Sequence, residues 1–193
     1  MPPANLNPPT LSVPALIEAL GLVAHDEGGY FRQLYQSDWT VPTDREGGAR
    51  YGLNTIYYLL TADSPKGHLH RNQSDIVHFF HAGSPLTYFL LSPEGQLSKV
   101  VMGPDPAQGQ VFQMTVPGGY WKASLLASGD FGLISEAVCP GFDYRDRELA
   151  TPATVRGAFP QHWGALAPYV LDHARDTVCG QTASGQMDSR EAG

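Results

Sequence analysis

The chain has 193 residues, of which 42% are hydrophobic and only 16% are charged, and it contains 21 glycines and 16 prolines. This composition favours one turn-rich β domain over a helical bundle. A formal net charge of −7 without any run of lysine or arginine argues against binding to nucleic-acid phosphates or to an anionic membrane surface. The two cysteines, Cys139 and Cys179, lack the CxxC spacing of a structural zinc site.

The beginning of the chain is expected to be a flexible leader over residues 1–12, because it is rich in Pro and Asn. It lacks the basic start and apolar stretch of a signal peptide, and no apolar run approaches the roughly 20 residues of a membrane helix. We therefore expect a soluble, cytoplasmic protein. Residues 13–20 predict a short amphipathic helix that Ser12 caps and Gly21 ends.

Short segments rich in β-branched and aromatic residues follow, separated by Gly- and Pro-containing turns, and this spacing indicates an all-β sandwich or barrel. Residues 152–175 carry an apolar stripe and predict one or two helices against the outside of the barrel. We expect a single domain over residues 13–175 and a disordered tail over 176–193, which has little to bury. The predicted strands span residues 53–60, 76–82, 86–92, 96–102, 111–116, 120–126 and 131–138.

The segment Gly67-His68-Leu69-His70 is the first candidate site. In a strand, residues two apart point to one face, so both imidazoles are expected to converge on the same small volume. Two neutral histidines can bind a first-row metal when further ligands come from elsewhere. The alternative is that the pair only hydrogen-bonds a ligand or its surroundings.

Two further polar residues, Asp75 and His78, lie in one predicted strand and point to opposite faces of it. Either His78 or Asp75 can join an interior pocket, but both can do so only if the strand contains a bulge. The alternative for each is a solvated or hydrogen-bonded strand residue.

Lys122 shares a strand face with Tyr120 and Ser124. A lysine that points into an apolar barrel is costly unless it is paired, and it then becomes a candidate acid, base or anion clamp. The alternative is that this face is the outer one and that Lys122 is solvated.

Arg32 follows a glycine pair in the segment Glu27–Tyr35, and its planar guanidinium suits a carboxylate or a phosphate group. The alternative is an edge hairpin with an ordinary ion pair between Arg32 and Glu27. Glu136 lies in the last predicted strand, just before a Pro-Gly turn, and is a candidate buried carboxylate facing the pocket.

Two segments resemble the motifs of the cupin superfamily. GHLHRNQSDIVHFFHAG, residues 67–83, resembles the first motif, and GQVFQMTVPGGYWK, residues 109–122, resembles the second. The chain also resembles an uncharacterised cupin subfamily through its EGGYFR, IYYLL, PGG-W-K and PGFDY segments, over residues 13–150. The resemblance implies a double-stranded β-helix, or jelly-roll barrel, with an interior pocket and a tendency to form dimers.

The usual cupin metal set is incomplete in this chain. The resemblance implies that the metal-binding Glu of the first motif falls at Ile76, and that the last His falls at Lys122. Only His68 and His70 remain as metal-ligand candidates, and two histidines rarely hold a catalytic ion alone. A divalent metal such as Zn, Ni, Mn or Fe therefore stays an alternative cofactor, with none assigned outright.

Three functions remain open at this stage. The first is a metal-independent isomerase or epimerase acting on a small polar, sugar-like or carboxylate ligand. The second is a metal enzyme with a rearranged set of His68, His70 and either His78 or Asp75, and the third is a non-catalytic binding or storage barrel. The candidate catalytic residues are His70, Lys122 and His78, and the candidate ligand-binding residues are Arg32, His68, Tyr57, Tyr120 and Glu136.

The expected partners are a small molecule inside the barrel and a second copy of the chain, with neither nucleic acid nor membrane. The segment around Tyr30, Phe31, Tyr35 and Trp39 is rich in aromatic residues. Such a segment can add a strand to a neighbour's sheet and remove an exposed edge, so we expect a two-fold homodimer.

Overall fold

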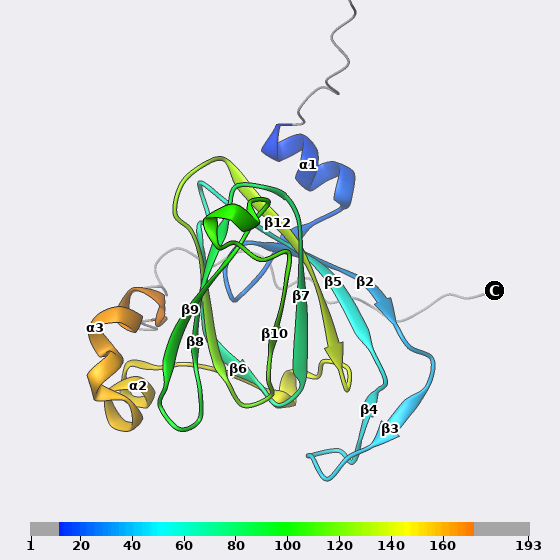
Figure 1. The fold of residues 1–193 in the computed structure, drawn as a ribbon. Coiled ribbons are helices and arrows are strands. Elements are labelled where there is room, and N and C mark those ends of the chain that lie inside the picture. Colours follow the sequence, from blue (N-terminus) through cyan, green and yellow to red (C-terminus); the bar gives the residue numbers. More distant parts are fainter. Residues whose placement is uncertain (1–11, 172–193) are drawn as a thin grey trace, which may run out of the picture.

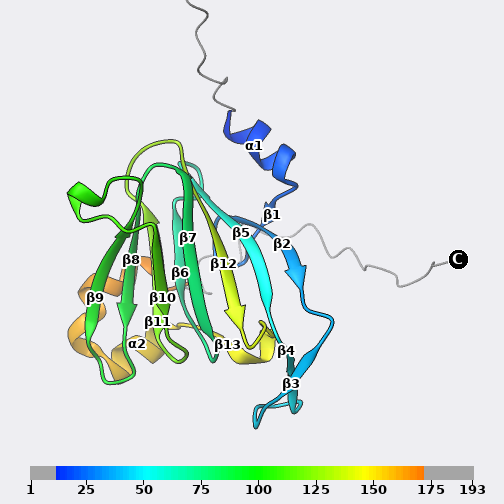
Figure 2. The same ribbon diagram turned by 45° about the vertical axis from the view of Figure 1, so that its right-hand side comes forward.

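Two antiparallel sheets of six and five strands face each other and enclose the interior of the protein (Figures 1 and 2). The computed structural model describes residues 12–171. The leader predicted over residues 1–12, except for Ser12, and the tail predicted over 176–193 lie outside the described residues. Within the described range, no helix is long and apolar enough to cross a membrane.

The six-stranded sheet has the order β1-β2-β5-β12-β7-β10, the five-stranded sheet has the order β13-β6-β11-β8-β9, and β3 pairs with β4 in a separate hairpin. The strands are β1 Val23–Ala24, β2 Tyr30–Gln36, β3 Thr40–Pro42, β4 Ala49–Tyr51, β5 Asn54–Thr61, β6 Lys66–Asn72, β7 Asp75–Gly83, β8 Leu86–Leu91, β9 Leu97–Met102, β10 Gln113–Val116, β11 Trp121–Leu126, β12 Phe131–Cys139 and β13 Arg147–Leu149. The helices are α1 Val13–Leu20, α2 Pro152–Ala158 and α3 Trp163–Leu166, with short 3-10 turns η1 Pro106–Gln108, η2 Tyr144–Asp146, η3 Pro160–His162 and η4 Ala167–Tyr169.

The predicted all-β class with a few short peripheral helices is confirmed, and the seven predicted strands correspond to β5 and to β7 through β12. Helix α1 begins where Ser12 Oγ accepts a hydrogen bond from the Ala15 amide at 3.4 Å, and it ends at Gly21 with a φ of 61°. The predicted strands do not include β2, whose residues YFRQLYQ do not alternate regularly between apolar and polar, or β13, whose three residues REL include two charged ones. Pairing with β5 and β6 holds these two strands in place.

Three apolar clusters hold these layers together. The first lies between the two sheets and includes Tyr58, Leu86 and Ile134. The second lies on the outer face of the five-stranded sheet, where Leu69 packs with residues of α2, α3 and η4, as predicted for helices on the outside of the barrel. The third joins α1 to the outer face of the six-stranded sheet through Leu59 and its neighbours.

Candidate functional site

The interior of the barrel changes from apolar to polar along its strands. On β12, inward-facing Ile134 belongs to the central apolar cluster, whereas Glu136 and Val138 line a cavity at one end of the barrel. On β5, Tyr58 belongs to the same cluster, and the inward positions that precede it line the cavity. The cavity has a volume of about 90 Å³ and is lined by His25, Glu27, Phe31, Gln33, Asn54, Ile56, His70, Asn72, Ile76, Lys122, Glu136, Val138, Phe142 and Tyr144.

Lys122 projects into this cavity from β11 and crosses to the opposite sheet. Its Nζ lies 3.1 and 3.2 Å from the two carboxylate oxygens of Glu136 and 3.0 Å from His78 Nε2. His78 Nε2 also lies 3.0 Å from Glu136 Oε1, and the two residues are cross-strand partners on β7 and β12. The side chains of Lys122 and His78 are only 5% and 0% exposed. Lys122 is therefore the paired interior lysine that the sequence offered as one possibility, and the alternative of a solvated Lys122 on the outer face is wrong.

The electrostatics of the cluster follow from its burial. Burial alone raises the pKa of Glu136, but Lys122 and His78 together hold that pKa well below its usual value. Burial and the neighbouring Lys122 ammonium lower the pKa of His78, although Glu136 opposes this shift. The cluster is therefore an ion pair between Lys122 and Glu136 with a histidine beside it. Because His78 lies behind this pair and does not line the cavity, it supports the site instead of facing a ligand.

A β-bulge in β6 decides where the two histidines of the HxH segment point. His70 is opposite Lys122 of β11 and Gly67 is opposite Ser124, so His68 and Leu69 together face the single residue Ala123. Such an extra residue breaks the alternation of side chains along a strand. Gly67 and His70, three residues apart, consequently both face the interior: a Cβ on Gly67 would contact the Ser124 and Tyr58 side chains, and His70 lines the cavity.

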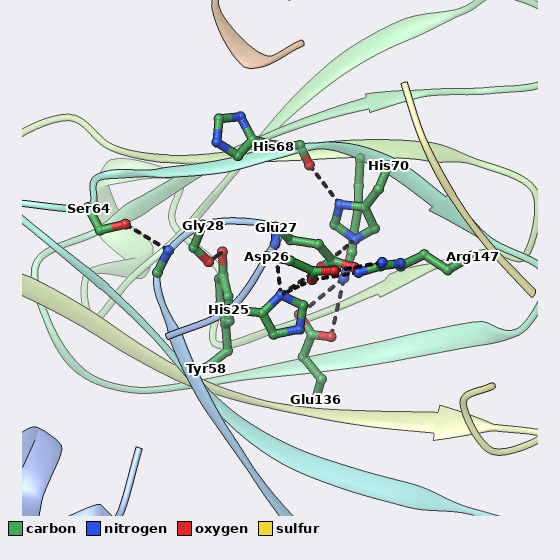
Figure 3. Close-up of polar contacts among 12 residues, drawn as sticks. His25, Asp26, Glu27, Gly28, Tyr58, Ser64, His68, His70, Glu136 and Arg147 are labelled. Carbon is green, nitrogen blue, oxygen red and sulfur yellow. Dashed lines mark hydrogen bonds and ion pairs between the residues drawn. The ribbon is translucent and has the colours of Figure 1, made fainter. Parts of the chain in front are cut away.

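The expectation that His68 and His70 converge on one volume is wrong, because the bulge turns the His68 ring away from the cavity. His68 Nδ1 lies 3.3 Å from the Tyr169 carbonyl oxygen, on the side of the sheet that η4 covers. Figure 3 shows the His68 ring pointing away from His70 and Glu27. His68 is therefore placed neither as a metal ligand with His70 nor as a ligand-binding residue of this cavity.

Glu27 reaches the cavity from the loop between β1 and β2. Tyr58 Oη donates to the Gly28 carbonyl at 3.0 Å, Ser64 Oγ accepts from the Gly29 amide at 2.8 Å, and the His68 amide donates to the Glu27 carbonyl at 2.6 Å (Figure 3). Only a residue without a Cβ fits at Gly28, whose φ is 90° and whose Cβ would lie 2.1 Å from the Lys66 carbonyl oxygen. The loop is thus tightly held against the barrel, with Glu27 directed inward.

The Glu27 carboxylate joins a second polar group in the cavity. Glu27 Oε2 lies 3.2 Å from His70 Nε2, and Glu27 Oε1 accepts from Arg147 at 3.2 Å. Arg147 also forms two short hydrogen bonds, of 2.6 and 2.7 Å, to both oxygens of Asp26. Opposite them, His25 Nδ1 accepts a hydrogen bond from the Glu27 amide at 2.9 Å. Burial and Lys122 lower the pKa of His70, and Glu27 opposes this shift.

Two predicted ligand-binding residues lie on the outer face of the six-stranded sheet and are corrected here. Arg32 donates to the Leu20 carbonyl at 2.9 Å, at the end of α1, and it points away from Glu27 because its neighbours Phe31 and Gln33 take the inward positions. Tyr57 packs in the cluster around α1 and has an edge contact with His81. In both cases strand alternation turns the side chain outward.

The remaining candidates also lie away from the cavity wall. Tyr120 is partly buried and packs against the apolar cluster between the sheets, outside the cavity lining. Asp75 is exposed, and its Oδ1 accepts a hydrogen bond from the Gly118 amide at 2.8 Å. Of the predicted residues, the structure therefore brings together Lys122, Glu136 and His70 around the cavity, with His78 behind them.

The donor set does not fit the metal site of the usual cupin motif. His68 points outward, Ile76 is apolar, and the ammonium of Lys122 is bound to Glu136. The rearranged set with Asp75 is not assembled either. Across residues 12–171, the one group of three or more His, Cys, Asp or Glu side chains with ligand atoms close together is His25, Asp26 and Glu27. There, Arg147 already binds oxygens of both carboxylates and His25 Nδ1 already accepts a hydrogen bond, so this group does not suit a cation.

Sequence reasoning missed His25, Glu27 as a cavity residue, and Arg147. The sequence separation explains this, since Glu27 and Arg147 are 120 residues apart. One local signal was available: Gly28 and Gly29 both have positive φ, and a Gly pair directly after a carboxylate is typical of a turn in which the backbone approaches another segment closely.

Comparisons with known proteins identify the family of this chain. A sequence model of the family described as "Cupin superfamily (DUF985)" matches residues 14–150. Uncharacterized protein YML079W of Saccharomyces cerevisiae is 40% identical over 151 residues, which cover 72% of this chain and 75% of that protein. A solved structure of a hypothetical protein from Leishmania major has a TM-score of 0.78 and 34% identity, and covers 84% of this chain and 100% of that one. Protein SO0799 from Shewanella oneidensis has a TM-score of 0.75 and 31% identity, and covers 84% of this chain and 99% of that one.

Proposed function

Since the chain belongs to the DUF985 family of the cupin superfamily, we propose that its barrel binds a small uncharged hydroxycarbonyl or polyhydroxyl compound and transfers a proton on it, as an isomerase or epimerase does. The observation that carries this proposal is the buried Lys122 ammonium, which lines the cavity while bound to Glu136 and His78. A cation held in a cavity of low dielectric stabilises negative charge that develops on a ligand oxygen during a reaction.

The size of the cavity supports a small ligand. A volume of about 90 Å³ holds roughly six to nine water-sized groups. A compound with a similar number of non-hydrogen atoms fits inside, and anything larger must extend past Tyr144, which is 61% exposed and lies at the cavity edge. Phe31 and Phe142 supply apolar walls against which the carbon face of a sugar-like compound can pack.

The charges support an uncharged ligand over a carboxylate. Lys122 already has Glu136 as its counter-ion, and Arg147 already has Asp26 and Glu27. A carboxylate ligand would have to displace one of these acids, whereas a hydroxyl or carbonyl oxygen can accept a hydrogen bond from Lys122 in place of one of its two bonds to Glu136 and leave the ion pair intact.

The roles follow from these positions. Lys122 donates to the ligand carbonyl oxygen and stabilises the oxyanion that forms when a proton leaves the adjacent carbon. His70 lines the same cavity and carries the transferred proton. Glu136 and His78 hold Lys122 in position.

Ligand screening tests the binding half of the proposal. Small aldoses, ketoses and hydroxyketones should raise the unfolding temperature by about 5 to 10 °C at roughly 100 times Kd, since a ligand that binds only the folded state stabilises it by mass action. Small carboxylates of equal size serve as the comparison set. Stabilisation by carboxylates alone would overturn the assignment of an uncharged ligand.

Proton transfer is tested in deuterated water with a compound that binds. The proton on the carbon next to the carbonyl should exchange for deuterium in the presence of the protein, as followed by NMR. Lys122→Met should slow this exchange by at least about 100-fold, and Lys99→Met, which alters an exposed lysine on β9, should not change it. Tight binding with no exchange in the wild-type protein would show a binding barrel and not an enzyme.

A further inference from the structure

We propose that Glu27 and His70 share one proton in the ligand-free protein and that this pair is the proton donor of the cavity. The first half concerns the resting protein alone, and the second half rests on the function proposed above. Both residues line the cavity, and neither is part of the cluster formed by Lys122, Glu136 and His78.

The tautomer of His70 is fixed by the backbone. His70 Nδ1 lies 2.7 Å from the carbonyl oxygen of His68. A carbonyl oxygen can only accept, so Nδ1 must carry a hydrogen and donate it. In a neutral imidazole the other nitrogen, Nε2, then presents a lone pair. The bulge in β6 brings the His68 carbonyl to this position, so the fold itself selects the tautomer.

The second ring nitrogen faces an acceptor. His70 Nε2 lies 3.2 Å from Glu27 Oε2, and an ionised carboxylate can only accept hydrogen bonds. A neutral His70 beside an ionised Glu27 would therefore put two lone pairs in contact in a buried place. One additional proton between Nε2 and Oε2 turns this repulsion into a charge-assisted hydrogen bond.

A count of the surrounding charges leads to the same result. The charged and titratable groups that face the pair are Asp26, His25, Lys122, Glu136 and Arg147. The positive charge of Lys122 is balanced by the carboxylate of Glu136. Arg147 forms its two shortest hydrogen bonds with Asp26. Glu27, which is only 9% exposed, shares the single positive charge of Arg147 with Asp26, and its second oxygen, Oε2, faces His70. A buried carboxylate whose charge is only partly balanced is costly, so a proton shared with His70 is favoured.

The arrangement also suits release of the proton. Arg147 holds Glu27 Oε1 at 3.2 Å and so directs Oε2 toward His70. Burial and the neighbouring Lys122 lower the pKa of His70 and so favour release of the shared proton, whereas the contact with Glu27 raises that pKa and favours its retention in the resting protein. During transfer, the C–H bond next to the carbonyl breaks while negative charge develops on the ligand oxygen that Lys122 holds, and the bond from the pair to the shared proton breaks as an O–H bond forms on that oxygen. The pair changes from neutral to singly negative, and it becomes neutral again when it accepts the proton released from the ligand carbon.

The experiment is NMR of the ligand-free protein labelled with ¹⁵N in its histidine rings, with His70 assigned through His70→Ala. We expect protons on both ring nitrogens of His70 at neutral pH, or an intermediate Nε2 signal with a strongly downfield proton. Glu27→Gln should remove that signal and leave a neutral ring. Glu148→Gln changes an exposed carboxylate paired with Arg71 and should leave the His70 spectrum unchanged.

A wild-type spectrum in which His70 is an ordinary neutral ring, protonated only on Nδ1, would overturn the proposal even if Glu27→Gln does not fold. The role as donor is read separately, with a compound that binds. Glu27→Gln should slow proton exchange by at least about 100-fold while Kd changes by less than about 3-fold. Unchanged exchange in Glu27→Gln would overturn the donor role. A shared proton in a protein that exchanges no ligand proton would overturn the proposed reaction and leave the resting-state assignment intact.

Discussion

Lys122 and His70 lie directly opposite each other on β11 and β6, yet their side chains pair with different carboxylates. Lys122 crosses the barrel to Glu136 on β12, whereas His70 contacts Glu27 in the loop between β1 and β2. Two facing positions on neighbouring strands therefore bring two polar pairs, Lys122 with Glu136 and His70 with Glu27, to one cavity of about 90 Å³.

Removing the ammonium should destabilise the protein more than removing the whole ion pair. Lys122→Met leaves Glu136 buried without its counter-ion, and we expect a loss of about 3 to 5 kcal/mol in the free energy of unfolding. The double variant Lys122→Met with Glu136→Gln should recover part of this loss. Urea unfolding measures both, with the exposed Lys99→Met expected within about 0.5 kcal/mol of the wild type. Equal losses in the single and double variants would contradict a coupled pair.

Acid should destabilise the fold in two pH windows. The lowered pKa of His78 means that the unfolded chain binds more protons than the folded one as the pH falls below 6.5. The depressed pKa of Glu136 gives a stabilisation that is present above pH 4.5 and is lost as the pH falls below that value toward the folded-state pKa. Each group contributes at most about 1.4 kcal/mol per pH unit.

These two windows can be assigned by substitution. Urea unfolding at successive pH values should show a smaller slope between pH 6.5 and 5 in His78→Gln, and a smaller slope below pH 4.5 in Glu136→Gln. His81→Gln changes a histidine at an exposed site hydrogen-bonded to Ser135 and is the matched control for the first window. A wild-type stability that does not change between pH 7 and 5 would show that His78 is not neutral in the folded state.

The two histidines of the HxH segment should behave differently. His70→Ala should weaken binding of a screened compound by at least about 10-fold, because it removes a cavity wall and a hydrogen-bonding group, equivalent to about 1.4 kcal/mol. His68→Ala should change Kd by less than about 3-fold and lower the stability by about 1 kcal/mol, since its ring contacts the Tyr169 carbonyl on the outer side. Isothermal titration and urea unfolding separate the two effects. Equal losses of affinity would mean that His68 also reaches the ligand.

Chelation should leave the protein unchanged. The donor atoms of the usual cupin metal set are not assembled, since Lys122 and Ile76 stand in two of its positions and His68 points outward. Dialysis against a strong chelator should shift the unfolding temperature by less than about 1 °C, corresponding to a few tenths of a kcal/mol in a domain of this size. A larger drop that Zn, Ni, Mn or Fe restores would show that the protein binds a metal through other donor atoms.

We also propose that the chain forms a two-fold homodimer. Leu34, Tyr35, Trp39 and Tyr51 are between 42% and 52% exposed, and they lie on β2, on β4 and directly before β3. A second copy would cover these side chains and the free edge of β2 beyond its pairing with β1. Light scattering at micromolar concentration should give twice the chain mass of 20.9 kDa. The double variant Leu34→Lys with Trp39→Lys should give monomers, whereas a monomeric wild-type protein would contradict the proposal.

The sequence by itself determined the regular parts of this protein. Segments rich in β-branched and aromatic residues and bounded by turn residues predicted β5 and β7 through β12, and Ser12 and Gly21 predicted the two ends of α1. These features depend on neighbours one to four residues away, so local periodicity and capping suffice to predict them. The shared strand face of Lys122 and Ser124 was also predictable, but not whether that face lay inside or outside the barrel.

Only the tertiary structure decided the composition of the site. The bulge at His68 and Leu69 exists because β6 has one more residue than β11 between the paired positions Gly67 and His70, and no local pattern records such a mismatch. Glu27 and Arg147 meet across 120 residues of sequence, once the loop after β1 and strand β13 have both packed against the barrel. Side-chain direction in a strand reverses with a single extra residue, and ion pairs form between whichever segments the fold brings together, so both depend on the packing of the whole chain.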